Sequence, residues 1–237
     1  MLEEHSVLYS LINPILVKLF HLPEGASVIP EHVLMAMVVV VVCLILFPLI
    51  RRRLRTTNPG YFQQVLELGV EWLIRLLTSN IGPQGRKYLP LIGTLGVFIL
   101  FANLLGIVPG FLPPASNINT TVGLALVSYV YYNMVGFRDK GLVKYLKQLG
   151  GPVSWMFPLF FPIEVISQFA RPLSLSLRLF GNIFGDHVLM MVFFSLFPLI
   201  VPLPMICLSM FVAGIQTYIF VLLSTIYIAG AVAAEEH

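Results

Sequence analysis

The chain has 237 residues, of which 58% are hydrophobic and only 11% are charged. A soluble globular domain carries about 25% charged residues, so this composition excludes an ordinary soluble enzyme or binding domain. The formal net charge of +3 is small, and we expect no nucleic-acid partner. The composition predicts an all-α polytopic membrane protein, built as a single membrane domain over residues 1–237.

The first half of the chain alternates apolar runs with basic segments. Residues 1–32 read as an interfacial lead-in, and residues 32–50 predict a first membrane span. The basic cluster 51–55 ends this span, which places that end in the cytoplasm and the N-terminus outside. Residues 61–87 mix apolar with charged and amide side chains, which predicts an amphipathic helix on the cytoplasmic interface.

Two further spans form a predicted hairpin. Residues 89–108 make the second span, and the Pro- and Gly-rich turn 109–114 should lie outside. The third span covers residues 120–135 and returns to the basic segment 138–147, which favours the cytoplasm.

The last third has hardly any polar break. A helix over residues 155–199 would be about 65 Å long, about twice the ~30 Å thickness of the hydrocarbon core. It must tilt steeply, kink or fold back, and its prolines and glycines offer places to bend. After a proline-rich turn, residues 205–234 predict a final helix with a cytoplasmic end. We expect the last two helices to be long and strongly tilted.

Arg178 lies within this apolar region, far from any chain end. Its guanidinium group cannot be deprotonated at any useful pH. A charge at mid-bilayer costs roughly 3 kcal/mol on insertion scales and about 10 or more in simulations of a lone helix. An ionisable residue at such a depth indicates a functional site, here one for ion movement.

Polar residues recur three and four positions apart on either side of Arg178, as neighbours on one helix face do. They are Glu164, Ser167, Arg171, Ser174, Asn182 and Asp186, followed directly by His187. The last helix carries a sparser stripe of Ser209, Gln216 and Tyr227. Such a stripe must face protein or water.

The alternative for each of these residues is simple packing between helices. Packing is favoured for Ser174 and Ser209, because serine commonly joins membrane helices. Packing and function stay open for Asn182 and Gln216, whereas His187 is of the residue type that suits a proton relay. The scattered histidines and the cysteines Cys43 and Cys207 have no metal-ligand spacing, so we expect neither a metal nor a cofactor.

The segment 171–182, Arg-Pro-Leu-Ser-Leu-Ser-Leu-Arg-Leu-Phe-Gly-Asn, resembles the signature of subunit a of the F-type ATP synthases. Segments 117–122, 215–220 and 235–237 match further family positions in the same order. The resemblance is closest to bacterial and chloroplast members, and it extends from the first span to the C-terminus.

The resemblance implies a non-catalytic stator subunit of the Fo membrane motor in a bacterial plasma membrane, rather than in a thylakoid membrane. Its implied partners are a ring of small hairpin c subunits, the peripheral-stalk subunit b and membrane lipids. Two laterally offset aqueous half-channels would carry protons, or Na⁺, to and from the ring carboxylates. Ion flow would thereby drive rotation and ATP synthesis.

Arg178 matches the family's essential arginine, which separates the half-channels and favours the ionised ring carboxylate. Glu164 matches the acid of the cytoplasmic path, and Asn182 and Gln216 match polar positions near the arginine. The expected proton path comprises Glu164, Arg171, Ser174, Asn182, Asp186, His187, Ser209 and Gln216.

Three positions depart from the family pattern. His187 stands where many bacterial members have Glu and mitochondrial members have His. The mitochondrial His pairs with a Glu whose position is Ser209 here, so Asp186 is the candidate acidic partner. Gly106 stands where some bacterial members carry an Asp.

The competing hypotheses are a stand-alone ion-coupled secondary transporter and a membrane-embedded enzyme. Secondary transporters usually show two matching halves with broken helices, whereas the polar stripe here lies only in the last third of the chain. No nucleophile–base or metal spacing supports an enzyme.

Overall fold

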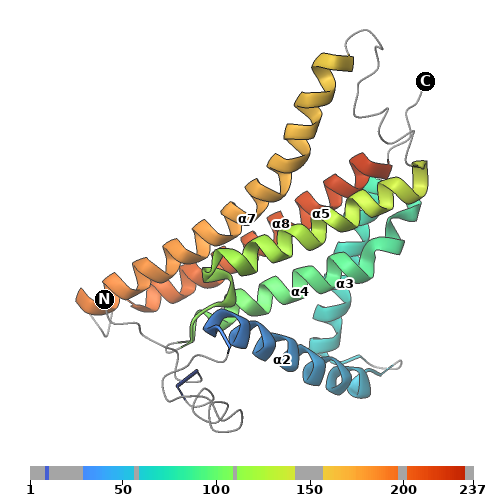
Figure 1. The fold of residues 1–237 in the computed structure, drawn as a ribbon. Coiled ribbons are helices and arrows are strands. Elements are labelled where there is room, and N and C mark those ends of the chain that lie inside the picture. The colour runs from blue at the N-terminus through green and yellow to red at the C-terminus, as the bar shows by residue number, and fades with distance from the viewer. Residues whose placement is uncertain are drawn as a thin grey trace, which may run out of the picture. The chain divides into compact units, whose positions relative to one another are not determined.

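The computed structural model describes residues 9–10, 29–55, 59–108, 111–141, 157–196 and 202–232. Every regular element within these ranges is a helix (Figure 1). The α-helices are α2 (Glu31–Arg53), α3 (Tyr61–Ile81), α4 (Leu89–Leu105), α5 (Ile118–Lys140), α7 (Phe157–Leu196) and α8 (Pro202–Val232). Two 3-10 helices, η1 (Pro83–Tyr88) and η2 (Pro114–Ser116), precede α4 and α5.

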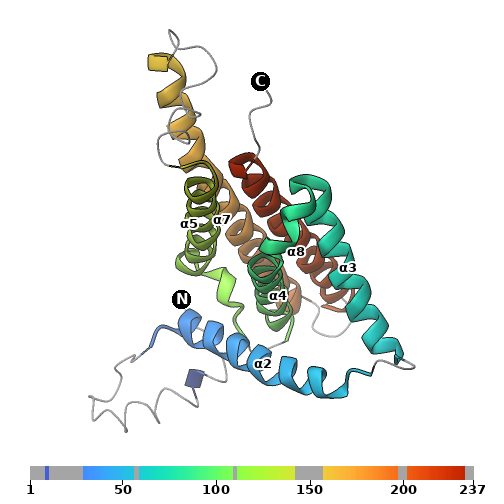
Figure 2. The same ribbon diagram turned by 90° about the vertical axis from the view of Figure 1, so that its right-hand side faces the viewer.

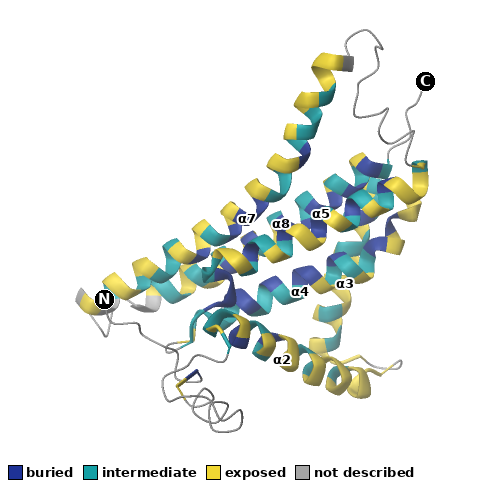
Figure 3. Cartoon of the chain, in the orientation of Figure 1, coloured by how far each residue is buried: buried dark blue, intermediate teal, exposed yellow. Residues whose placement is uncertain are grey.

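Three helical segments within the described ranges are long and apolar enough to cross a membrane. They are Glu31–Arg53, Pro83–Leu105 and Pro204–Val232. Most side chains of α2 are exposed (Figure 3), as expected of a helix whose apolar surface faces lipid. These features confirm the predicted all-α polytopic membrane protein. The spans predicted over residues 120–135 and 155–199, and the tilt of the last two helices, stay predictions.

The amphipathic helix predicted over residues 61–87 ends at Ile81 instead. Gly82 follows with a φ of 94°, and its amide donates to the carbonyl of Thr78 at 3.0 Å. The helix ends here because glycine adopts a positive φ without strain and the following proline cannot continue the helix. Residues 83–88 form η1 in place of a further α-helical turn.

Other helix ends differ by a few residues from those expected. Helix α5 continues to Lys140, because Gly141, with a φ of 77°, is the residue that caps it. Helix α7 is one uninterrupted helix with Pro162 and Pro172 inside it. Helix α8 begins at Pro202, and proline is tolerated in a first turn, where its missing N–H has no helical partner.

Several predicted features lie outside the described residues. They are most of the lead-in over residues 1–32, part of the turn 109–114, the basic residues 142–147 and the charged end 235–237.

The chain divides into two compact units. The first comprises Met1–Arg55, Val97–Thr121 and Leu179–Thr217, and the second comprises Thr56–Gly96, Val122–Arg178 and Tyr218–His237. Helices α4, α5, α7 and α8 each contribute residues to both. The single membrane domain predicted from the sequence stays a prediction.

The second unit has an aromatic core. The Tyr88 hydroxyl donates to Asp139 at 3.4 Å, and the Tyr88 ring meets the Tyr131 ring edge-on at 6.3 Å. The start of α4 therefore lies beside the end of α5, as in a hairpin. Trp72 and Tyr218 bring their rings within 5.6 Å, which packs α3 alongside α8 (Figure 2).

Gly85 marks a close approach between η1 and α3, since an added Cβ would lie 2.5 Å from the carbonyl oxygen of Leu77. Overpacking of this kind costs about 1–3 kcal/mol. We therefore expect Gly85→Ala to lower the thermal unfolding temperature of the detergent-purified protein. Gly69→Ala is the matched control, because its Cβ would meet nothing within 4 Å. It should be neutral or stabilise by up to about 1 kcal/mol, and equal losses in both variants would contradict this packing.

Candidate functional site

A small cavity lies in the first unit, between the end of α4, the second half of α7 and the first half of α8. Its volume is about 30 Å³. A cavity needs a volume of about 10–15 Å³ to hold one water molecule, so this cavity has room for one or two water molecules. Its polar lining consists of Asn103, Asn182, Asp186, His187, Ser209 and Gln216.

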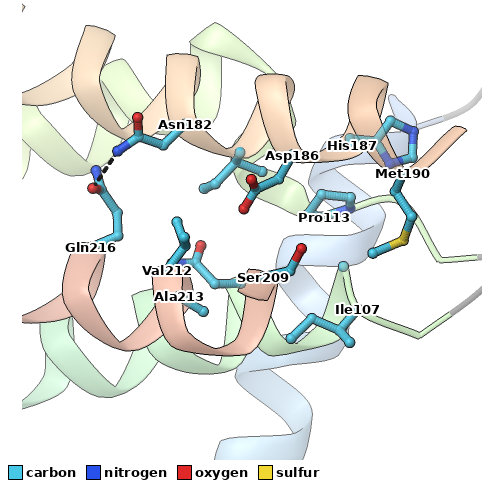
Figure 4. Close-up of a pocket in the computed structure, with 13 residues that line it drawn as sticks. Ile107, Pro113, Asn182, Asp186, His187, Met190, Ser209, Val212, Ala213 and Gln216 are labelled. Atoms are coloured by element: carbon cyan, nitrogen blue, oxygen red, sulfur yellow. Dashed lines mark hydrogen bonds between the residues drawn. The ribbon is translucent and has the colours of Figure 1, made fainter. Parts of the chain in front are cut away.

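A hydrogen bond joins α7 to α8 at one end of this cavity. The Asn182 side chain donates from Nδ2 to Oε1 of Gln216 at 2.7 Å (Figure 4). Gln216 is buried, with 3% of its surface exposed. Breaking this bond would leave the buried Gln216 amide without a partner, which costs free energy. The bond therefore holds the two side chains together within the unit.

The acidic part of the lining comes from α7. The Asp186 carboxylate points into the space between α7 and α8, on the side of Ser209 (Figure 4). The His187 ring lies farther along α7, beside Met190 and away from Gln216. Adjacent residues on a helix do not face each other, yet here both Asp186 and His187 line the cavity.

Asn103 is a cavity residue that the sequence-based reasoning missed. It lies near the end of α4, is 7% exposed, and neither polar atom of its side chain has a hydrogen-bond partner among the described residues. A buried amide left without partners costs about 1–3 kcal/mol, so water in the cavity is its natural partner. The signal was present in the sequence, because an Asn interrupts an otherwise apolar run.

Gly106 faces the same cavity and leaves no room for a side chain. A Cβ added there would lie 2.7 Å from Cβ and 2.8 Å from Cγ of Pro113. The acidic side chain that some relatives were expected to carry at this position cannot fit here unless Pro113 moves. The carboxylate in the described lining of this cavity is that of Asp186.

A second polar group lies in the second unit. Arg171 Nη2 and Glu164 Oε1 form an ion pair at 3.2 Å, with both side chains about one third exposed. The Arg171 guanidinium also lies over the Tyr227 ring of α8, 5.6 Å from its centre. A cation held against a ring face and a carboxylate is fixed from two sides.

Arg178 and Ser174 are exposed residues of α7. Arg178 has no ion-pair partner among the described residues. In the sequence of α7 it follows the Glu164–Arg171 pair and precedes the cavity residues Asn182, Asp186 and His187.

A family model described as ATP synthase A chain matches residues 33–229 of this sequence. The chain belongs to this family. Its relatives include ATP synthase subunit a 1 of Syntrophotalea carbinolica, which is 50% identical over 183 residues covering 77% of each chain. Subunit a of Nitratiruptor sp. is 46% identical over 81% of this chain and 85% of its own. Subunit a of Sulfurihydrogenibium sp. is 41% identical over 87% of this chain and 99% of its own.

Within this chain, the expected path residues fall into two groups. Asn182, Asp186, His187, Ser209 and Gln216 line the cavity of the first unit. Glu164 and Arg171 pair in the second unit, and Ser174 and Arg178 belong to neither group. Gln168, which donates to Glu164, was missed although it lies four residues after Glu164 on the same helix. Tyr132, which donates to Gln168, was missed because its partner lies on a different helix.

The Asn182–Gln216 bond should appear as a coupling energy in thermal unfolding of the purified protein. Asn182→Leu leaves the buried Gln216 amide without its donor, at a cost of about 1–3 kcal/mol. Adding Gln216→Leu should recover part of that loss, since contacting residues couple by about 0.5–3 kcal/mol. Purely additive losses in the two single variants and the double variant would contradict the bond.

Proposed function

We propose that this chain is the stator subunit of the proton channel of an F-type ATP synthase. It provides two offset aqueous half-channels, and Arg178 separates them while ring carboxylates pass. Ion flow through the half-channels is coupled to rotation and to ATP synthesis, whose chemistry belongs to other subunits. Family membership supports the assignment to the complex.

The observation that carries the proposal is the exposed charge of Arg178. It lies in an apolar helix and has no ion-pair partner among the described residues. Such a charge is costly in hydrocarbon unless water or a counter-charge meets it. A carboxylate on a neighbouring subunit would supply that counter-charge, and a fixed cation would in turn favour the ionised form of the carboxylate.

The cavity of the first unit suits the outer half-channel. It is polar, it has room for water, and it carries Asp186, His187 and the unpartnered Asn103 amide. Asp186 takes the role that some relatives give to an acid at the position of Gly106. Ser209 contributes a hydroxyl group where mitochondrial relatives have Glu.

The Glu164–Arg171 pair suits the cytoplasmic half-channel. Both side chains are partly exposed, so water can reach them. Glu164 would pass the proton between the ring and the cytoplasm, and Arg171 would fix the position of its carboxylate. Ser174 lies one helical turn before Arg178 on the same helix and completes the polar stripe.

The partners in this proposal are a ring of c subunits, subunit b and the surrounding lipids. The transported ion is H⁺ or Na⁺. The carboxylate that selects between them belongs to the ring and not to this chain. The chain would lie in a bacterial plasma membrane with its N-terminus outside and its C-terminus in the cytoplasm. The basic cluster at the end of α2 supports this orientation.

Arg178→Ala should abolish ATP-driven proton pumping in inverted membrane vesicles while the complex still assembles. The reason is that the ring carboxylates lose the cation that keeps the two paths apart. Arg75→Ala is the matched control, because Arg75 pairs with Glu71 on the exposed face of α3. It should pump like the parent protein. Transport of a solute by the purified protein alone, without its complex, would sink the proposal.

Asp186→Asn should slow proton pumping, since positioned acid–base groups contribute about 10²–10⁴-fold to proton transfer. The amide keeps the size of the side chain and removes its ability to exchange a proton. Ser195→Ala on the same helix is the control, because the Ser195 hydroxyl only bonds the carbonyl of Val192. Wild-type pumping by Asp186→Asn would remove Asp186 from the path.

A further inference from the structure

Five side chains in the second unit form a closed circuit of contacts, which we call the five-residue cluster. Its members are Tyr132 of α5, Glu164, Gln168 and Arg171 of α7, and Tyr227 of α8. Each member touches two others. The circuit closes because the Tyr132 and Tyr227 rings lie 5.8 Å apart. Three helices thus contribute to one polar arrangement.

The orientation of the Gln168 amide is determined by its two neighbours. The Tyr132 hydroxyl donates to Oε1 of Gln168 at 2.6 Å, and Nε2 of Gln168 donates to Oε1 of Glu164 at 3.4 Å. An ionised carboxylate only accepts hydrogen bonds, so the amide nitrogen must face Glu164 and the oxygen must face Tyr132. Turning the amide over would place its oxygen against the carboxylate.

Tyr132 and Gln168 are buried, whereas the Glu164 carboxylate is not. Tyr132 is 1% exposed and Gln168 is 9% exposed, while the Glu164 side chain is 36% exposed. The cluster therefore has a rigid, dry side and a side open to its surroundings. Glu164 lies at the boundary, anchored through the same oxygen by Gln168 and by Arg171.

We propose that Tyr132 and Gln168 are positioning residues that hold the Glu164 carboxylate in the orientation required for proton transfer. The inference rests on the proposed function of Glu164. Proton transfer needs donor and acceptor within about 2.6–3.2 Å, so a carboxylate that swings freely transfers more slowly than a fixed one. Tyr227 does the same for Arg171 from the opposite side of the circuit.

The competing explanation is that the Tyr132–Gln168 bond only joins α5 to α7. The second unit contains a suitable comparison, because Ser128 of α5 and Ser224 of α8 form a buried hydrogen bond at 3.0 Å. That bond also joins two helices, and neither serine belongs to the five-residue cluster. Loss of either bond should weaken helix packing to a similar degree. Only loss of the Tyr132–Gln168 bond should change the orientation of the Glu164 carboxylate.

The test uses the assembled synthase in inverted membrane vesicles. Tyr132→Phe removes the hydroxyl group and keeps the ring against Tyr227. The net free energy of one hydrogen bond corresponds to about a two- to tenfold change in an equilibrium constant. The rate of ATP-driven proton pumping should therefore fall by about that factor, while the complex assembles normally. Gln168→Leu should give the same loss. Ser128→Ala should pump like the parent protein.

A Glu164→Gln background separates positioning from packing. With no carboxylate to orient, Tyr132→Phe should cause no further loss of pumping in that background. An equal loss in both backgrounds, or an equal loss in Ser128→Ala, would overturn the proposal. So would normal pumping by Tyr132→Phe and Gln168→Leu, or failure of both variants to assemble. Arg178→Ala tests the stator function separately, so the positioning role can fail while that function stands.

Discussion

The proposed function depends on one constraint, which is the fixed charge of Arg178 within a long apolar helix. The guanidinium group cannot give up its proton, and hydrocarbon offers it no solvation. On the same helix, the side chains that lie next to Arg178 are those three or four residues away. The polar residues of α7 accordingly recur at this spacing, from Glu164 to Asp186.

The same constraint explains how the other polar side chains are satisfied. Asn182 is bonded to Gln216, and Glu164 to Arg171, so each pair supplies internally what lipid cannot. Asn103 and Ser176 are exceptions among the described residues, since the buried Asn103 amide and the buried Ser176 hydroxyl have no protein partner. A buried amide without a protein partner, next to a cavity, indicates a position where a water molecule binds.

The sequence was sufficient for the helices and insufficient for their contacts. Long apolar runs report directly on membrane spans, because backbone groups in lipid can be satisfied only within a helix or a closed barrel. The end of α3 is also encoded in the sequence, since Gly82 followed by Pro83 is a signal for the end of a helix. The Tyr132–Gln168 bond was not accessible in this way, because a tyrosine in an aromatic-rich helix reads as packing until its partner is known.

The tight approach of Pro113 to Gly106 limits which substitutions each of these two positions accepts alone. A single change from glycine to an acidic residue places a side chain against the proline ring, so Pro113 has to move or be replaced as well. Positions 106 and 113 are therefore coupled, because the side chain that one of them accepts depends on the side chain at the other.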